Sequence, residues 1–152
     1  MEQRPRVQPP TQNVLDSFGV KGAPTFLPGG EGRVYKAGNI ILKHIFKDNI
    51  DTMIWTAQLL AGLPENGFRI SKPLKTMDSN WFADSWSAWI FLDGSHPTSS
   101  QYSQMIEAIV AFHKAIAHAP KPSFIDSEDS PYRRADRYAW ELLPQKIHPA
   151  LI

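Results

Sequence analysis

The apolar pattern changes its period along the chain, and the order of these changes is the strongest constraint on the fold. From about Val20 to Ile45, short runs of β-branched and aromatic residues are separated by glycine turns, which is typical of antiparallel strands. Further strands are expected in "FRISKPLKT" and "WFADSWSAWIFL", joined by turn residues 78–80. From Pro97 onward the pattern is helical. Strands segregated from helices in this way predict an α+β fold with a mainly antiparallel sheet.

One helix is expected inside the strand region. In "DNIDTMIWTAQLLAGLP" the apolar residues fall on one helical face. Asp48 or Asn49 can cap the start of this helix, and Gly62 followed by Pro64 can end it. The predicted order is therefore three strands, a helix and two strands.

Two helices are expected after the strands, and a flexible tail before them. Ser99 or Ser100 is expected to cap a helix with an apolar face made of Tyr102, Met105, Ile106, Ile109, Phe112 and Ile116. A second helix is expected to begin at Ser130, because Pro131 is tolerated in a first turn. Residues 1–12 contain three prolines and are expected to form a flexible tail.

Composition and charge exclude several classes of partner. The 152 residues suffice for one domain with a core. A formal net charge of +1 produces no long-range field, so no nucleic-acid partner is expected. No run of about 18 apolar residues occurs, so no membrane partner is expected. Without cysteines or an apolar N-terminal leader, the chain is expected to be cytoplasmic.

The stretch "FLPGGEGRVYKAGNIILKHI" contains the residues with the clearest chemical potential. Glycine lets backbone N–H groups approach a phosphate without a Cβ in the way, and the glycines here are Gly29, Gly30 and Gly32. Lys43, on a later strand, can place its ammonium on the same phosphates. The alternative is an ordinary turn and a solvated lysine. It is not a Walker loop, because no G-K-[ST] and no helix directly follow the glycines.

The order of these elements resembles the small lobe and first helices of the kinase-like aminoglycoside phosphotransferase family, and of its actinobacterial-type members in particular. The similarity runs from about Phe26 to the C-terminus. It is carried by "LPGGEGRVYKAGNIILK", "RISKPLKT", "WSAWIFLDG", "AFHKAIAHAPKPSFID" and "SPYRRADRYAW". The resemblance implies a kinase-like N-lobe in residues 13–92, with about five antiparallel strands and one helix. Residues 93–152 would be a partial helical C-lobe.

The resemblance also implies a nucleotide site. The loop of Gly29, Gly30, Glu31 and Gly32 would cover the phosphates of ATP or GTP, and Lys43 would contact them. Hydrogen bonds to adenine would come from the backbone of a hinge formed by Trp89, Ile90, Phe91 and Leu92. The phosphoryl acceptor would be a hydroxyl of an unidentified small molecule.

Two departures from the family pattern bear on catalysis. The expected helix offers Met53, Trp55 and Thr56 where the family has a glutamate that pairs with the strand lysine. The histidine-x-aspartate catalytic loop and the later magnesium-binding aspartate are absent, and the chain reaches "PQKIHPALI" about where that loop would approach.

We therefore expect the N-terminal part of a phosphotransferase, truncated before its catalytic loop and inactive alone. Magnesium is expected only with the missing part, and no catalytic or metal-binding residue is predicted in this chain. The alternative is a nucleotide-binding, pseudokinase-like or interaction module without catalysis.

Overall fold

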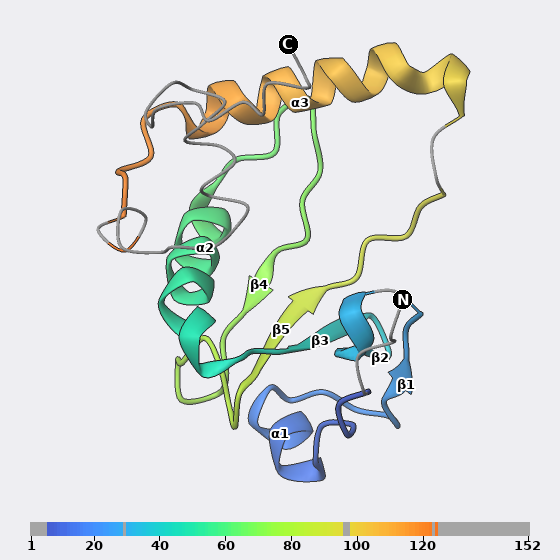
Figure 1. The fold of residues 1–152 in the computed structure, drawn as a ribbon, viewed down its shortest axis with the longest axis vertical. Coiled ribbons are helices and arrows are strands. Elements are labelled where there is room, and N and C mark those ends of the chain that lie inside the picture. The colour runs from blue at the N-terminus through green and yellow to red at the C-terminus, as the bar shows by residue number, and fades with distance from the viewer. Residues whose placement is uncertain (1–5, 29, 96–97, 123, 125–152) are drawn as a thin grey trace, which may run out of the picture. The chain divides into compact units, whose positions relative to one another are not determined.

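The computed structural model describes residues 6–28, 30–95, 98–122 and 124. The chain divides into two compact units, Met1–Ala119 and Pro120–Ile152, and every helix and strand described below belongs to the first. The fold is α+β, with a five-stranded antiparallel sheet and three α-helices (Figure 1). The strands are β1 (Thr25–Phe26), β2 (Val34–Ala37), β3 (Ile40–His44), β4 (Pro73–Leu74) and β5 (Trp86–Ile90). The helices are α1 (Gln12–Ser17), α2 (Ile50–Gly62) and α3 (Tyr102–Ile116).

The strands lie in the order β1-β2-β3-β5-β4, and every neighbouring pair is antiparallel. The β2–β3 hairpin forms where the sequence predicts it, because Gly38 adopts a φ of 58° at the turn. In its register Val34 lies opposite Lys43. β5 is inserted between β3 and β4, and its first four residues are buried. The predicted strands around β4 and β5 are shorter than expected, and Phe91 and Leu92 lie beyond the end of β5.

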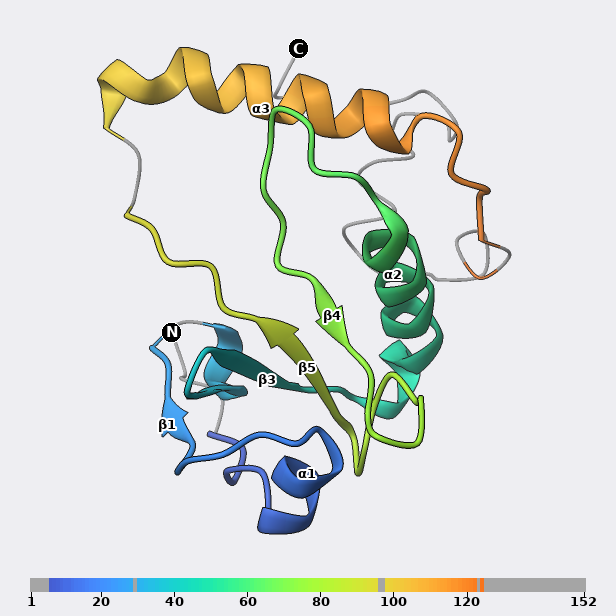
Figure 2. The same ribbon diagram turned by 180° about the vertical axis from the view of Figure 1, so that it is seen from behind.

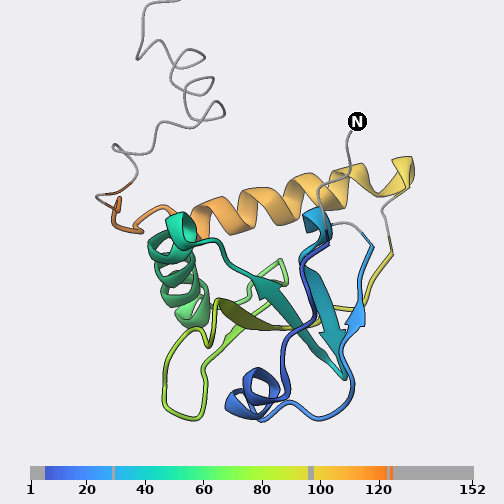
Figure 3. The same ribbon diagram turned by 60° about the horizontal axis from the view of Figure 1, so that its bottom comes forward.

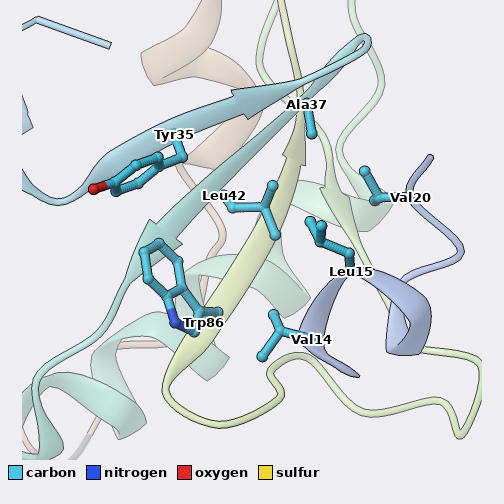
Figure 4. Close-up of a cluster of buried hydrophobic side chains, with 7 residues drawn as sticks. All are labelled: Val14, Leu15, Val20, Tyr35, Ala37, Leu42 and Trp86. Atoms are coloured by element: carbon cyan, nitrogen blue, oxygen red, sulfur yellow. The ribbon is translucent and has the colours of Figure 1, made fainter. Parts of the chain in front are cut away.

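Alternation along β3 divides the core between the two faces of the sheet. Leu42 is fully buried in one cluster, whose buried members are Val14, Leu15, Val20, Tyr35, Ala37, Leu42 and Trp86 (Figure 4). Its neighbour Ile41 belongs to a second cluster with Ala57 and Trp89. Because successive strand residues point to opposite faces, α1 and α2 cover opposite faces of the sheet. Figures 1 and 2 both show α2 beside β4.

The N-terminal segment packs against the sheet, which the prediction of a flexible tail over residues 1–12 did not anticipate. Arg6 Nε donates to the Tyr35 hydroxyl at 3.0 Å, and that hydroxyl donates to the Val7 carbonyl at 2.6 Å. The Val7 amide donates to the Gly32 carbonyl at 3.0 Å. The short helix α1, also unanticipated, is the next element along the chain (Figure 3), and it contributes Val14 to the core (Figure 4).

Helix α2 confirms the helix predicted in this region, and Gly62 is its last residue. Asn49 occupies the position before the helix, but its side chain makes no capping hydrogen bond. The C-terminal end is closed by Lys72, whose ammonium donates to the carbonyls of Leu60 (3.0 Å) and Leu63. A cation at this end satisfies free carbonyls and interacts favourably with the helix dipole.

Helix α3 is also predicted correctly, but its start differs in detail. The capping box is made by Thr98 and Gln101, whereas Ser99 and Ser100 lie within a short 3₁₀ turn before the helix. The Phe112 ring packs edge-on against Phe68, with 5.5 Å between the centroids. Much of the apolar face is exposed, including Tyr102, Met105, Ile106, Ile109 and Val110. The second predicted helix, from Ser130, lies outside the described residues.

None of the described helices combines the length and apolar character needed to cross a membrane.

Candidate functional site

A hollow of about 340 Å³ lies where β2 begins and β3 ends. Its walls are formed by Glu31, Arg33, Val34, Lys43 and His44. Two of the residues predicted from the sequence to bind phosphate, Glu31 and Lys43, therefore share one cavity. The hairpin register explains this arrangement, because the pairing of Val34 with Lys43 brings the loop before β2 beside the end of β3.

The glycine-rich stretch forms a tight turn at the edge of this hollow. Gly30–Gly32 form a tight turn that is kinked at Glu31, where the backbone is not helical, and Gly29 lies outside the described residues. Gly32 has a φ of 78°, and Glu31 also has a positive φ of 57° with a ψ of 29°. A left-handed glutamate is uncommon, and its presence allows the chain to reverse sharply between two glycines. The Glu31 carboxylate forms an ion pair with the Arg33 guanidinium.

Lys43 brings to the hollow a cation that forms no ion pair with any described residue. Its ammonium lies 5.1 Å from the centroid of the Trp89 ring, on the neighbouring strand. The side chain is exposed to solvent, yet surrounding protein removes part of the water from the ammonium, and this burial lowers the pKa of Lys43. No carboxylate among the described residues forms an ion pair with it. An anionic ligand would therefore meet a cation with no competing partner.

Helix α2 does not supply the missing carboxylate. The side chains that α2 packs toward the sheet are Met53, Ala57 and Leu60, all apolar. The acidic residue in its first turn, Asp51, is exposed. Helix α2 therefore presents apolar side chains to the core cluster beneath Lys43.

Sequence reasoning did not single out Arg33 and His44 as site residues. The Arg33 guanidinium lies 4.7 Å from the centroid of the Phe46 ring, and the Arg33 carbonyl accepts from the His44 amide at 3.0 Å. The His44 ring meets Trp86 edge-on, and its buried Nδ1 has no hydrogen-bond partner within the described part of the chain. Burial, and then the charge of Arg33, lower the pKa of His44. Only the strand register could have revealed that Arg33 and His44 lie together at the hollow.

Much of the hydrogen-bonding capacity of the predicted hinge is used within the protein. The Ile90 amide donates to the Lys72 carbonyl at 2.8 Å, and the Ile90 carbonyl accepts from Ser71 Oγ at 2.7 Å. The Phe91 amide donates to the Asn39 carbonyl at 2.8 Å. Among the four predicted hinge residues, the Leu92 amide makes no hydrogen bond to any described residue. A ligand could use this amide without breaking a sheet contact.

Trp89 occupies the core beneath the site. Its side chain is buried, and its Nε1 donates to Ser87 Oγ at 2.9 Å. It belongs to the cluster on the Lys43 face of the sheet, against which Leu27, Val34 and Phe91 pack while remaining partly exposed. This face therefore combines apolar side chains suited to a flat ring with a cation at its end.

The described residues contain no group of three or more histidine and acidic side chains that could hold a metal ion. The magnesium implied by the family resemblance would therefore find no such group of ligands among the described residues.

Comparisons with models of protein families, with curated proteins and with solved structures found no match. The functional class of the chain is therefore inferred from the fold and the hollow.

Proposed function

We propose that this chain binds a nucleotide, ATP or GTP, as the N-terminal part of a kinase-like phosphotransferase that acts on a hydroxyl of a small molecule. The observation that carries the proposal is the position of Lys43. Its ammonium lines a hollow beside a glycine-rich turn and has no carboxylate partner among the described residues. A partly desolvated cation beside a glycine-containing turn is suited to bind phosphate oxygens.

The order of the structural elements along the chain supports this proposal. The glycine-rich turn precedes β2, Lys43 lies on β3, α2 follows, and β5 returns beside β3. On the Lys43 face, Leu27 and Val34 offer a partly exposed apolar surface on which a base could stack, in the same cluster as Phe91, whose ring centroid lies 3.6 Å from the Lys36 ammonium. The unengaged Leu92 amide could recognise the edge of that base.

Binding rather than transfer is the function that the chain's own residues support. Phosphoryl transfer depends on positioning and on charge neutralisation by metal ions and catalytic-loop residues. The sequence contains no histidine-x-aspartate run, and the described residues form no metal cluster. Among the described residues Lys43 has no acidic partner, which also favours the alternative, a pseudokinase-like module that binds nucleotide without catalysis.

Calorimetric titration of ATP and GTP into the chain tests the binding proposal. We expect a dissociation constant near millimolar, a binding free energy of about −4 kcal/mol. The reason is that Lys43 is the one lysine or arginine lining the hollow that no described carboxylate engages. Lys43→Ala should weaken binding at least about tenfold, which corresponds to about 1.4 kcal/mol.

The matched control is Lys75→Ala. Lys75 also places its ammonium over a tryptophan ring, 4.8 Å from the Trp81 centroid, but it does not line the hollow. Its replacement should leave the affinity unchanged. Equal nucleotide affinity in the wild-type and Lys43→Ala chains would reject the proposed site. Phosphate release or transfer by the chain with ATP and Mg²⁺ would reject the view that it only binds.

A further inference from the structure

The hollow holds a second cation, Arg33, that is already engaged by a carboxylate of the same turn. Glu31 and Arg33 form an ion pair at the mouth of the site, with 52% of the Glu31 side chain and 24% of the Arg33 side chain exposed. Both residues line the hollow together with Lys43. Counting Arg33 and Lys43 against Glu31, with His44 neutral, the wall carries one net positive charge.

Arg33 is held in position independently of Glu31. Its guanidinium lies over the Phe46 ring at 4.7 Å, and its carbonyl accepts a hydrogen bond from the His44 amide at 3.0 Å. An arginine placed by a ring contact and by the backbone can exchange one anionic partner for another without a large rearrangement. Phosphate matches the planar guanidinium as well as a carboxylate does.

The two cations reach the hollow from opposite faces of the sheet. Lys43 shares its face with Val34, its partner in the register, whereas Arg33 precedes Val34 and shares its face with His44. A single phosphate on Lys43 is expected to leave the Arg33–Glu31 pair intact. Because both cations line the same hollow, a ligand with two or three linked phosphates is expected to contact Lys43 and Arg33 together.

We propose that the Glu31–Arg33 pair is a built-in counter-ion that selects for a polyphosphate: a di- or triphosphate displaces the Glu31 carboxylate from Arg33, and a monophosphate does not. The inference rests on the proposed function, because it assigns the phosphate chain of the nucleotide to this hollow. The half-exposed carboxylate returns to water at little cost, since surface ion pairs contribute little stability.

The test compares adenosine, AMP, ADP, ATP and free tripolyphosphate by calorimetry at low salt. In the wild-type chain, affinity should rise from AMP to ATP and fall as salt is added. Arg33→Gln should weaken the binding of ATP and of tripolyphosphate roughly tenfold, which is the effect of losing one charge-assisted contact. The affinity for adenosine should not change. Arg33→Lys should give an intermediate loss, because lysine keeps the charge without the bidentate fork.

Glu31→Gln gives the most specific prediction. This substitution removes the negative charge of Glu31 but keeps the length of the side chain. ATP should therefore bind several-fold more tightly, while the affinity for AMP should not change. Arg69→Gln is the control, since Arg69 is an exposed arginine that does not line the hollow. Thermal unfolding of each variant checks that the turn still folds.

The outcomes separate this inference from the proposed function. If Lys43→Ala weakens ATP binding while Arg33→Gln and Glu31→Gln do not change it, the counter-ion proposal fails and the nucleotide site stands. In another outcome, tripolyphosphate binding depends on both Arg33 and Lys43 while ATP binds no more tightly than tripolyphosphate. In that case the polyphosphate site stands and the nucleotide proposal fails, because the adenosine part of ATP contributes no affinity. If no phosphate compound binds, both are overturned.

Discussion

The ammonium of Lys43 lies 5.1 Å above the Trp89 ring, so the cation of the candidate site rests on an aromatic side chain of the core. The ring in turn is fixed by the hydrogen bond from its Nε1 to Ser87 Oγ. Cation–aromatic contacts of this kind hold a lysine without neutralising it. The arrangement positions Lys43 although no described carboxylate forms an ion pair with it.

Replacing Lys43 should change the dependence of stability on alkaline pH. Burial lowers the pKa of Lys43 in the folded chain below its ordinary value of 10.5. Between these two values the unfolded chain binds more protons, so stability rises with pH. Lys43→Met should flatten this rise and change the free energy of unfolding near neutral pH by no more than about 0.5 kcal/mol. Melting temperatures recorded from pH 8 to 10.5 measure this pH dependence of stability in both chains.

The control for this experiment is Lys75→Met, which removes a lysine with a similar aromatic contact outside the hollow. It should leave the alkaline slope as in the wild-type chain. An identical slope in wild-type and Lys43→Met would mean that burial does not perturb Lys43.

His44 should make the fold sensitive to mild acid. Burial and then the nearby charge of Arg33 lower the pKa of His44 below 6.5 in the folded chain. As pH falls below 6.5, the unfolded chain takes up a proton that the folded chain resists, so stability is lost toward the lowered pKa. His44→Leu should reduce the fall in melting temperature between pH 7 and pH 5. Arg33→Gln should reduce it partially.

A wild-type melting temperature that falls no more steeply than that of His44→Leu would contradict this account of His44. The Nδ1 atom of His44 provides a second readout, because it is buried with no hydrogen-bond partner among the described residues and its protonation can be followed by NMR.

The hydroxyl of Tyr35 should hold Arg6 and Val7 against the sheet. It bridges Arg6 Nε and the Val7 carbonyl, and Val7 is in turn bonded to Gly32 of the turn. Tyr35→Phe should destabilise the fold by about 1 kcal/mol, because it leaves both groups without this partner. It should also speed trypsin cleavage after Arg6. Tyr102→Phe, on an exposed position of α3, should change neither quantity. Unchanged cleavage in Tyr35→Phe would show that the bridge does not hold the segment.

The apolar face of α3 should bind hydrophobic dyes. Ile106 and Ile109 are 61% and 52% exposed, which is unusual for side chains of this type grouped on one helix. Replacing both with lysine should lower dye fluorescence and leave the free energy of unfolding within about 0.5 kcal/mol. Phe112→Ala should instead destabilise by about 1 kcal/mol or more, because its ring packs on Phe68. Dye binding that is insensitive to the double substitution would place the apolar surface elsewhere.

The elements predicted correctly are those whose signals are local. Helix α2 is marked by its apolar spacing and by Gly62 at its end, and the β2–β3 hairpin by Gly38. Helix α1 was missed because its six residues are too few to show a period, and its burial depends on Leu42 and Trp86 from distant strands.

The candidate site was predicted only in part, for the same reason. The sequence alone indicated the glycine-rich turn and Lys43, because turn residues and an isolated lysine in an apolar strand are visible without a partner. It also showed that the stretch forming α2 contains no glutamate. It did not indicate that the Ile90 and Phe91 amides are used by Lys72 and Asn39.

The sequence by itself therefore determined the local elements of this protein, since periodicity and turn chemistry act over a few neighbouring residues. Only the tertiary structure brought Arg33 and His44 to the hollow and Arg6 to Tyr35, a partner 29 residues away. Strand register and packing decide which distant side chains meet, and neither is encoded in a single segment.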